Sequence, residues 1–457
     1  MKPVISNCAF PRPTVRPIIL AMILTFAVSV FGADKKDQVL YAFKGGSDGI
    51  WVRSGLVEDK AGNLYGTTFT GGSPCETQVQ TGCGIIFQLV PPGAPGGSWT
   101  ENVIYSFHGP DGNGPTGNLT LDESGNLYGA ANGGECCGII FQLAPPSSQG
   151  GSWTFTTLYN FQGEPDGAAP TGGLIFDKAG NIYGATYSGG AFDSSGIIFE
   201  LSPPTGSGGA WTETVLFTFD FLDHPGIGYN PTSGVVMDKS GNLYGVTSVG
   251  GIRKKGGEGV VFKLGRPTTG GASWSYKVLH AFQGEPSDGA FPVGGLVFDE
   301  AGNLYGTTSA GGSHKCTVPY TQPCGTVFQL TPPLWTESVL YNFSGGSDGW
   351  DPQASLVFHN DGVLYGTTTN GGGGCGNGGC GTIFQLVPPT SGSSKWTESV
   401  LYAFRGGNDG EGPAANVLFG SGGAIYGTTT FGGNNGTCPN TGTPPYPGCG
   451  TVFEFIP

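Results

Sequence analysis

Hydrophobic residues recur along this chain in short clusters that are separated by turns rich in glycine and proline. Residues 294–343 contain one full set of these clusters. They predict four strands, at residues 294–299, 304–308, 326–330 and 335–343. Because no stretch shows a helical period, the pattern predicts an all-β fold built from short strands.

A tandem repeat organises these clusters. The sequence Gly-Asn-Leu-Tyr-Gly-Thr-Thr, in this or a closely related form, occurs seven times. Its tyrosines are Tyr65, Tyr128, Tyr183, Tyr244, Tyr305, Tyr365 and Tyr426. Their successive spacings are 63, 55, 61, 61, 60 and 61 residues, so one structural unit is copied along the chain.

Seven copies of a four-stranded unit predict a seven-bladed β-propeller with four antiparallel strands in each blade. A β-solenoid is the main alternative, but its repeats are shorter and more uniform. Residues 38–43 match the fourth strand of a unit although they come first. The last unit offers only three strands, at residues 416–419, 424–429 and 451–455. We therefore expect the N-terminal strand to complete the last blade and close the ring.

Glycines and aromatic residues recur at fixed places in the unit. A glycine follows each repeat tyrosine, and we expect it to allow close approach of the backbone near the ring axis. A phenylalanine ends each fourth strand, and most fourth strands begin with tryptophan followed by threonine or serine. These aromatic residues are expected to pack neighbouring blades together.

The first 33 residues differ from the rest of the chain. Three basic residues precede an apolar run at residues 18–31, and two small residues follow it. This is the pattern of a secretory signal peptide, and the run is short for a membrane span, which needs about 20 residues. We expect residues 1–33 to be a signal peptide and residues 34–457 to be one exported propeller. An uncleaved N-terminal anchor is the alternative.

Charge narrows the classes of partner. Three of the 19 basic residues lie in the first 33 residues. Residues 34–457 therefore contain 16 basic and 33 acidic residues, and their net charge is −17. Such a surface repels nucleic acid phosphates and anionic lipid, but it is compatible with a neutral glycan, a cationic partner or calcium. The chain lacks the D-x-[DN]-x-[DN]-G spacing of calcium ligands. We therefore expect no cofactor, no metal, no nucleic acid and a monomer.

Ten cysteines follow the first segment and fall in pairs within single repeats. The pairs are Cys75 and Cys83, Cys136 and Cys137, Cys316 and Cys324, Cys375 and Cys380, and Cys438 and Cys449. In an exported protein this arrangement predicts five local disulfides. Zinc binding is the alternative, although the spacings vary and regular C-x₂-C pairs are missing. For the adjacent pair in the second repeat, a vicinal disulfide and two free thiols are both open.

Two kinds of loop vary between repeats, and we expect them to share one face. They are the loop that leads into each blade and the loop between its second and third strands, and binding residues usually lie in such loops. The candidate binding aromatics are Trp51, Trp350, Tyr229 and Phe291. Plugging of the channel mouth is the alternative role for them. The aspartates of recurring Asp-Gly pairs are further binding candidates, with a structural turn as the alternative: Asp48, Asp111, Asp166, Asp288, Asp348 and Asp409.

Two histidines fall in loops of the same face. His108 and His224 could each form a His–carboxylate pair for general acid–base catalysis, with an ordinary surface histidine as the alternative. No H-E-x-x-H or P-loop pattern is present. These histidines are therefore catalytic candidates only if the protein is an enzyme.

The unit Asp-x-x-Gly-Asn-Leu-Tyr-Gly-Thr-Thr-x-x-Gly-Gly, followed by Cys-Gly-Thr-Val-Phe-Gln-Leu and Trp-Thr-Glu-x-Val-Leu-Tyr, resembles the GloVer tandem-repeat family of exported bacterial proteins. The match covers nearly all of residues 38–457. The resemblance implies propeller-like repeats and export, and it implies no biochemical role, because the family has none assigned. Many members carry a C-terminal anchor that this chain lacks, so we expect release. A weaker similarity to propeller repeats of bacterial two-component sensors suggests ligand sensing.

Three functional hypotheses follow. The leading one is a secreted or cell-surface binding module for a glycan or surface polymer, without catalysis. The second is an extracellular polysaccharide hydrolase or lyase with acid–base residues on the variable-loop face. The third is a structural component of the envelope or matrix. Fold alone does not decide among them.

Overall fold

The computed structural model describes residues 36–457 with several gaps. The gaps are residues 76–81, 95, 149, 192–194, 207, 252–256, 270–271, 314–323, 360, 377, 391–394, 421, 434–437 and 439–447. The chain divides into two units, Met1–Asp34 and Lys35–Pro457. The predicted signal peptide lies outside the described residues. Within them, no helix is long and apolar enough to cross a membrane.

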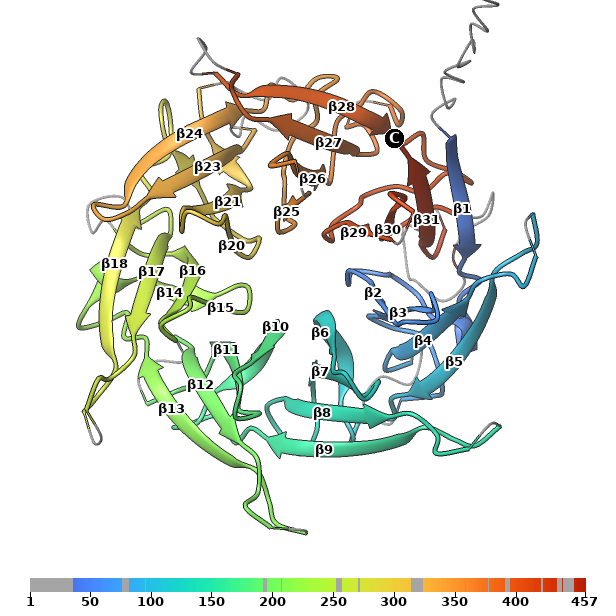
Figure 1. Ribbon diagram of the computed structural model, residues 1–457, viewed down its shortest axis with the longest axis horizontal. Helices are drawn as coiled ribbons and strands as arrows, with labels where there is room; N and C mark the ends of the chain where they lie inside the picture. Colours follow the sequence, from blue (N-terminus) through green and yellow to red (C-terminus); the bar gives the residue numbers. More distant parts are fainter. Residues whose placement is uncertain are drawn as a thin grey trace, which may run out of the picture. The chain divides into compact units, whose positions relative to one another are not determined.

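The second unit is a seven-bladed β-propeller, as the repeat predicts (Figure 1). The first blade consists of β2 (Val57–Glu58), β3 (Leu64–Thr68), β4 (Ile85–Val90) and β5 (Thr100–Ser106). The second consists of β6 (Asn113–Leu121), β7 (Leu127–Asn132), β8 (Ile139–Ala144) and β9 (Thr154–Asn160). The third consists of β10 (Ala168–Phe176), β11 (Ile182–Ser188), β12 (Ile197–Ser202) and β13 (Thr212–Thr218).

The remaining blades follow the same antiparallel order. The fourth contains β14 (Tyr229–Pro231) and β15 (Val236–Met237), which both pair with β16 (Leu243–Val249), then β17 (Val260–Gly265) and β18 (Ser275–Ala281). The fifth contains β20 (Val297–Phe298), β21 (Leu304–Thr308), β23 (Thr326–Thr331) and β24 (Thr336–Asn342), with the pair β19 (Gly289–Ala290) and β22 (Ala310–Gly311) beside it. The sixth contains β25 (Val357–Phe358), β26 (Leu364–Thr368), β27 (Thr382–Val387) and β28 (Thr397–Ala403).

The two ends of the propeller unit meet in the seventh blade. It joins β29 (Leu418–Phe419), β30 (Ile425–Thr429) and β31 (Thr451–Ile456) to the N-terminal strand β1 (Lys36–Ala42). Strand β1 pairs antiparallel with β31, from Lys36 opposite Ile456 to Ala42 opposite Thr451. The predicted closure of the ring by the N-terminal strand is therefore confirmed. Two short 3₁₀ helices, Gly46–Asp48 and Pro225–Ile227, lie in loops.

The innermost strands of the fifth and seventh blades are shorter than predicted. In the fifth blade, β20 covers only two of the six residues expected at 294–299. The reason is a change of hydrogen-bond partner. The Gly295 N–H donates to Ser355 Oγ of the next blade at 2.8 Å, so it contributes to contact between blades. The other three strands of this blade lie within one residue of their predicted bounds.

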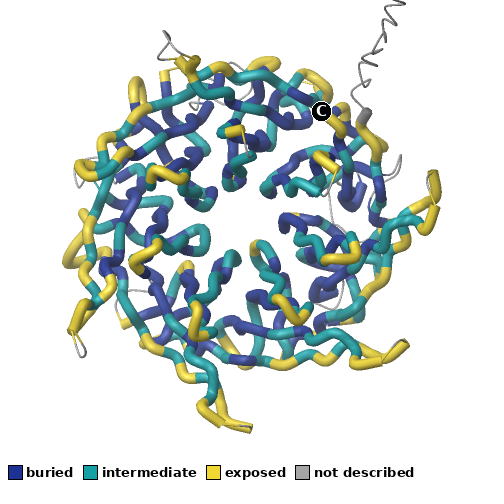
Figure 2. Tube along the Cα trace, viewed as in Figure 1, coloured by how far each residue is buried: buried dark blue, intermediate teal, exposed yellow. Residues whose placement is uncertain are grey.

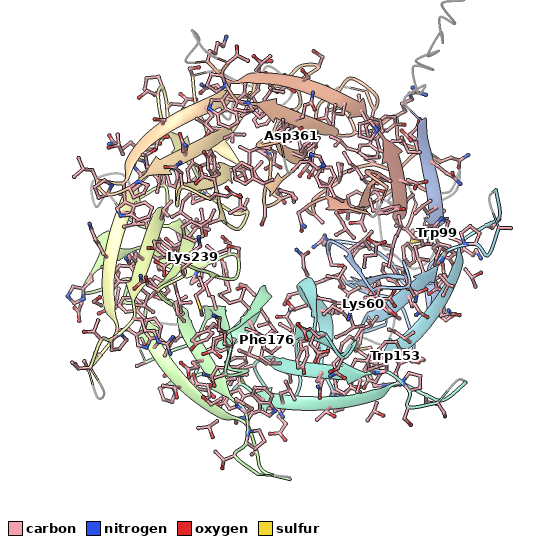
Figure 3. The ribbon with its side chains drawn as sticks, viewed as in Figure 1. Lys60, Trp99, Trp153, Phe176, Lys239 and Asp361 are labelled. Carbon is pink, nitrogen blue, oxygen red and sulfur yellow. A yellow bond between two sulfur atoms is a disulfide. The ribbon has the colours of Figure 1, made fainter. Side chains whose placement is uncertain are left out.

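The hydrophobic core runs around the ring between blades (Figure 2). All five residues of β3 are buried, whereas no residue of the outer strand β5 is. Phe43, which is fully buried, contacts Phe87 of the next blade with ring centroids 5.1 Å apart. The tryptophans extend this packing, since Trp153, which is labelled in Figure 3, meets Tyr65 of the preceding blade with ring centroids 5.9 Å apart. The predicted packing of aromatic residues between blades is confirmed.

The repeat glycine has a more local role than expected. Gly66 lies opposite Phe87 in the β3–β4 ladder. A Cβ atom on Gly66 would stand 2.6 Å from Phe87 Cζ and 3.1 Å from Leu56 Cδ2. The glycine therefore makes room for an aromatic ring of its own blade, which in turn contacts the outer strand of the preceding blade.

Deletion of residues 36–43 is expected to lower the melting temperature by about 10 °C or more, because loss of buried Phe43 alone costs about 3–5 kcal/mol and β31 also loses its partner strand. Thermal unfolding followed by circular dichroism measures the effect. Leu334→Ala, at a side chain that is 84% exposed, should melt like the unaltered protein. A deletion variant with an unchanged melt would contradict ring closure through β1.

Gly66→Ala is expected to lower the free energy of unfolding by about 1–3 kcal/mol, because the added methyl group overlaps Phe87. Gly93→Ala is the matched control, since a Cβ atom there meets nothing within 4 Å. Chemical denaturation measures both variants. Equal stability of the two variants would show that the glycine is not required for packing.

Candidate functional site

Two sets of loops lie side by side on one face of the propeller, as predicted. The inter-blade loop, which leads from one outer strand into the next blade, forms bridges with the loop between the second and third strands, which we name the middle loop. Bridges join Ile50 to Thr70, Trp350 to Asn370 and Glu411 to Phe431, and in the fifth blade the contact is the β19–β22 pair. We call this side of the molecule the variable-loop face.

Where the chain enters each blade, one residue with positive φ occupies an equivalent place, in three blades at the start of strands β6, β10 and β14. We call these seven residues the rim positions. They are Trp51, Gly114, Ala169, Asn230, Phe291, Asp351 and Gly412, with φ values of 61, 48, 52, 55, 54, 60 and 66°. Five of the seven are not glycine, although the left-handed region costs such residues roughly 1–2 kcal/mol. Strain of this kind is concentrated at ligand-binding and active sites.

A hydrogen bond to the preceding blade fixes each rim position. The rim N–H donates to a carbonyl oxygen just before the third strand of that blade, at 2.7 to 3.1 Å. The acceptors, in rim order, are Cys449, Cys83, Cys137, Ser195, Glu258, Cys324 and Cys380. Five of the seven carbonyls belong to the second cysteine of a repeat pair. The cysteine pairs therefore brace the segment that holds the rim of the next blade.

The cysteines of four of the five predicted pairs lie at disulfide distance. These pairs are Cys75–Cys83, Cys136–Cys137, Cys375–Cys380 and Cys438–Cys449, with Cα–Cα distances of 5.1, 3.7, 5.2 and 5.0 Å. The two sulfur atoms of the adjacent pair also lie within bonding distance, which favours a vicinal disulfide over two free thiols. The fifth predicted pair includes Cys316, which lies outside the described residues.

A central cavity of about 590 Å³ opens inside this rim. The residue two places after each rim position lines it in all seven blades: Arg53, Thr116, Thr171, Thr232, Val293, Gln353 and Ala414. Deeper in, Asn118 Nδ2 donates to Asn416 Oδ1 at 2.6 Å, which links the second and seventh blades. The lining is mainly hydroxyl, amide and small apolar groups. Arg53 is the exception, and its guanidinium lies over the rings of Trp51 and Phe69, 5.6 and 5.1 Å from their centroids.

The four candidate aromatics fall at two adjacent places in this arrangement. Trp51 and Phe291 are rim residues, and Tyr229 and Trp350 directly precede rim residues. Phe291 is 36% exposed, whereas the other three are half-buried and pack against the hydrophobic core. The structure thus places all four around one feature. Their part in ligand binding stays a prediction.

The six Asp-Gly aspartates connect each inter-blade loop to the outer strand that precedes it. A tyrosine at the end of the preceding outer strand donates to five of them: Tyr41 to Asp48, Tyr105 to Asp111, Tyr159 to Asp166, Tyr341 to Asp348 and Tyr402 to Asp409. His280 replaces the tyrosine beside Asp288. A backbone N–H of the same loop also donates to each carboxylate. These contacts give the aspartates a structural role, and ligand binding by them stays a prediction.

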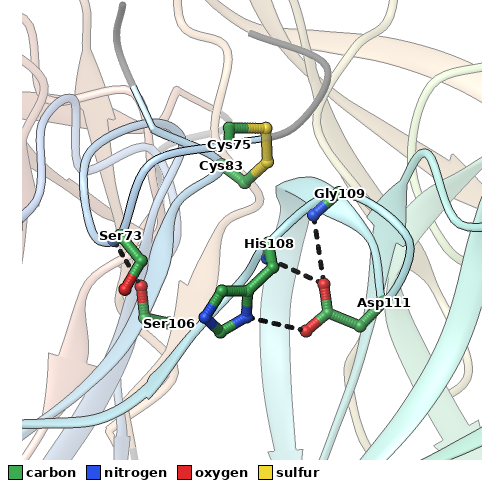
Figure 4. The surroundings of a disulfide bond; sticks show 7 residues. All are labelled: Ser73, Cys75, Cys83, Ser106, His108, Gly109 and Asp111. Atoms are coloured by element: carbon green, nitrogen blue, oxygen red, sulfur yellow. Dashed lines mark hydrogen bonds and ion pairs between the residues drawn. A yellow bond between two sulfur atoms is a disulfide. The ribbon is translucent and has the colours of Figure 1, made fainter. Parts of the chain in front are cut away.

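The two catalytic candidates each have a nearby carboxylate. His108 Nδ1 lies 3.3 Å from Asp111 Oδ2, close to the Cys75–Cys83 disulfide (Figure 4). His224 Nδ1 lies 3.2 Å from Asp220 Oδ2. Both rings are largely exposed, at 54% and 69%. They belong to the loops that lead into the second and fourth blades, so the third blade separates them.

Several cavity and face residues were not identified from the sequence. Arg53 and Gln353 line the cavity, and Tyr187, which is 44% exposed, lies at its edge. A signal for them exists, because six of the seven rim residues directly precede a proline. When the repeats are aligned on that proline, the residue before it is the rim residue, which differs in most units. The residue directly after the proline lines the cavity.

Partly buried glutamates stand beside several of the interface aspartates. The outer strands place Glu101 near Asp48, Glu213 near Asp166, Glu337 near Asp288 and Glu398 near Asp348. Within the described residues, Oε1 of each of these glutamates is buried without a hydrogen-bond partner. Burial, and then repulsion by the aspartate, raises the pKa of each glutamate to about 7.

Glu213→Gln is expected to change how stability depends on pH. The folded glutamate, with a pKa of about 7, keeps a proton that the unfolded chain releases near pH 4.5. Its stabilising contribution is therefore complete below pH 4.5 and is lost as the pH rises through 7. At pH 8 the free energy of unfolding of the variant should exceed that of the unaltered protein by about 1 kcal/mol, after allowance for solvent screening. At pH 4.5 the two values should differ little. Melting curves across this range measure it.

Glu123→Gln is the matched control for this effect, because Glu123 is exposed in a turn. Its melting curve should follow that of the unaltered protein at every pH. A stability difference between Glu213→Gln and the unaltered protein that is equal at pH 4.5 and pH 8 would contradict the raised pKa.

Several solved structures resemble the chain at low sequence identity. The extracellular domain of BT4673 from B. thetaiotaomicron is 12% identical, with 92% of this chain and 42% of that chain covered and a TM-score of 0.48. The chain thus spans less than half the length of that protein. A protein of unknown function from Dyadobacter fermentans is 14% identical, with 80% and 97% covered and a TM-score of 0.42. A luciferin-regenerating enzyme is 10% identical, with 93% and 95% covered and a TM-score of 0.40.

At the sequence level, no curated protein matches the chain. A family model described as the Gloeobacter/Verrucomicrobia repeat matches residues 75–319 and 316–457. These segments make up well over half of the chain and include the repeat motif from which the resemblance was first inferred. The chain therefore belongs to the Gloeobacter/Verrucomicrobia repeat family.

Proposed function

We propose that this protein is an extracellular binding module whose ligand, a neutral glycan or surface polymer, is held by the variable-loop face at the mouth of the central cavity. The observation that carries this proposal is the set of rim positions. Their backbone is fixed in the same left-handed conformation in seven blades, yet their side chains range from glycine to tryptophan. A backbone that is the same in every blade, with side chains that differ between blades, is typical of a recognition surface built on a rigid scaffold.

The cavity lining favours a polyhydroxylated ligand. Threonine hydroxyls and the amides of Asn118, Gln353 and Asn416 offer both donors and acceptors without opposing charge. Exposed rings at Tyr187 and Phe291 stand on the same face and offer surfaces on which sugar rings can stack. The acidic chain disfavours a polyanion, which supports a neutral polymer.

The disulfides support a location outside the cytosol. Four are present in the described residues, and such bonds persist in oxidising compartments. Export agrees with the signal segment inferred at residues 1–33.

Cleavage of a polysaccharide by a hydrolase or lyase mechanism is the second candidate function, and the His108–Asp111 pair is the observation that favours it. The pair is exposed on the variable-loop face and has the donor and acceptor that general acid–base chemistry requires. The same experiment tests both candidates when ligand binding and product release are recorded together.

Binding to a panel of neutral soluble polysaccharides is expected to raise the melting temperature of the full chain without releasing products. Tyr187→Ala and Phe291→Ala should each weaken binding about 10-fold, because exposed aromatic rings commonly contribute 1–3 kcal/mol to recognition. Affinity electrophoresis with the polymer that gives the largest shift measures this loss.

Leu334→Ala is the matched control, because this exposed hydrophobic side chain lies in the turn between the third and fourth strands, away from the variable loops. It should bind like the unaltered protein. Product release that His108→Ala abolishes would replace the binding proposal with the enzyme proposal. Affinity that both aromatic variants retain in full would overturn the location of the site.

A further inference from the structure

One blade interface has a different chemistry from the others. At four interfaces a glutamate of an outer strand stands beside the inter-blade aspartate, and Oε1 of that glutamate is buried without a hydrogen-bond partner within the described residues. At three of the four, the residue that faces this carboxyl pair is a tyrosine: Tyr41, Tyr159 and Tyr341. At the fourth it is His280. A single change in the repeat therefore adds an imidazole nitrogen to a pair of carboxylates.

The three side chains converge closely. His280 Nε2 lies 3.1 Å from Asp288 Oδ2 and 3.3 Å from Oδ1. One ligand atom from each of His280, Asp288 and Glu337 lies within 4.8 Å of the other two. Bonds of about 2.0–2.2 Å to a tetrahedral ion place donor atoms roughly 3.5 Å apart, so a small rotation of the Glu337 side chain would complete the set.

Neighbouring groups hold two of these side chains in place. The Asp288 carboxylate accepts the N–H groups of Gln283 at 2.8 Å and Gly289 at 2.7 Å, which leaves lone pairs for an ion. The His280 ring packs edge-on against Phe282, with centroids 4.8 Å apart. Supporting contacts of this kind orient the ligands of metal sites.

The charge of these three side chains and their partial exposure to solvent also suit a divalent cation. Two carboxylates and a neutral imidazole carry a charge of −2, which a divalent cation would neutralise. The side chains of His280 and Asp288 retain 17% and 11% of their exposure, so the site has access to ions and to a water as fourth ligand.

We propose that His280, Asp288 and Glu337 bind one divalent transition-metal ion, for which Zn²⁺ has the best-fitting ligand set. Zn²⁺ takes imidazole nitrogen and carboxylate oxygen atoms as ligands, and sites with three protein ligands leave a fourth position open for water. The ion would link the outer strands of the fourth and fifth blades to the loop between them. This inference is independent of the proposed glycan site, which lies at the central cavity.

A second group of metal-type residues does not carry the same inference. Cys375, Cys380 and Glu411 also lie within 4.8 Å of one another. The two cysteines form a disulfide, so they offer no thiolate to an ion.

Calorimetric titration of the EDTA-treated full chain with ZnCl₂ tests the proposal. One ion is expected to bind per chain and to raise the melting temperature. His280→Tyr should weaken binding by at least about 100-fold, because loss of a direct ligand exceeds the 10–100-fold effect of losing a supporting contact. Its melting temperature without zinc should stay close to that of the unaltered protein, since tyrosine fills this place at five other interfaces.

Two further variants, Glu337→Gln and Tyr341→His, test whether zinc binding depends on this set of ligands. The first removes a ligand and should also abolish zinc binding. The second places an imidazole beside Asp348 and Glu398, so the number of bound ions should rise from one to two. Absence of zinc binding to the unaltered chain, or equal affinity in His280→Tyr, would overturn the proposal. Zinc binding that only Cys375→Ser abolishes would place the ion at the cysteine pair instead and would equally overturn it.

Discussion

The hydrogen bond from each rim N–H to the carbonyl of the preceding blade is the contact on which the variable-loop face depends. It holds a residue in the left-handed region, where side chains other than glycine are strained, and it repeats seven times around the axis. Five of the acceptors are cysteine carbonyls, so the disulfides act on this contact rather than at random loop positions. The strain at the rim is offset by covalent bracing immediately behind it.

Side-chain contacts, rather than main-chain hydrogen bonds, distinguish the outer edge of each interface between blades. A tyrosine or histidine of one blade and an aspartate of the next loop meet there, and at four interfaces a partly buried glutamate joins them. Burial of a second carboxyl beside a first is costly unless it holds a proton or meets a cation. The same architecture can therefore respond to pH where the facing residue is tyrosine, and to a metal ion where it is histidine.

Periodicity was sufficient to predict the fold. The spacing of the repeat tyrosines gave the number of blades, and the early position of residues 38–43 gave the closure of the ring through β1. The length of the inner strands could not be predicted in the same way. Gly295 donates to a side chain of the next blade, and a partner from another repeat leaves no periodic signal in its own segment.

The candidate site was predicted in part, and the reason is physical. Aromatic residues such as Trp51 and Phe291 stand out in a loop sequence, whereas Arg53 and Gln353 do not. Their significance comes from the ring, which brings one residue from each blade to the same cavity. Since the rim backbone is held by main-chain hydrogen bonds, its side chains can change without loss of the fold. A repeat protein built in this way can alter what it binds one blade at a time, because each blade contributes a separate part of the surface.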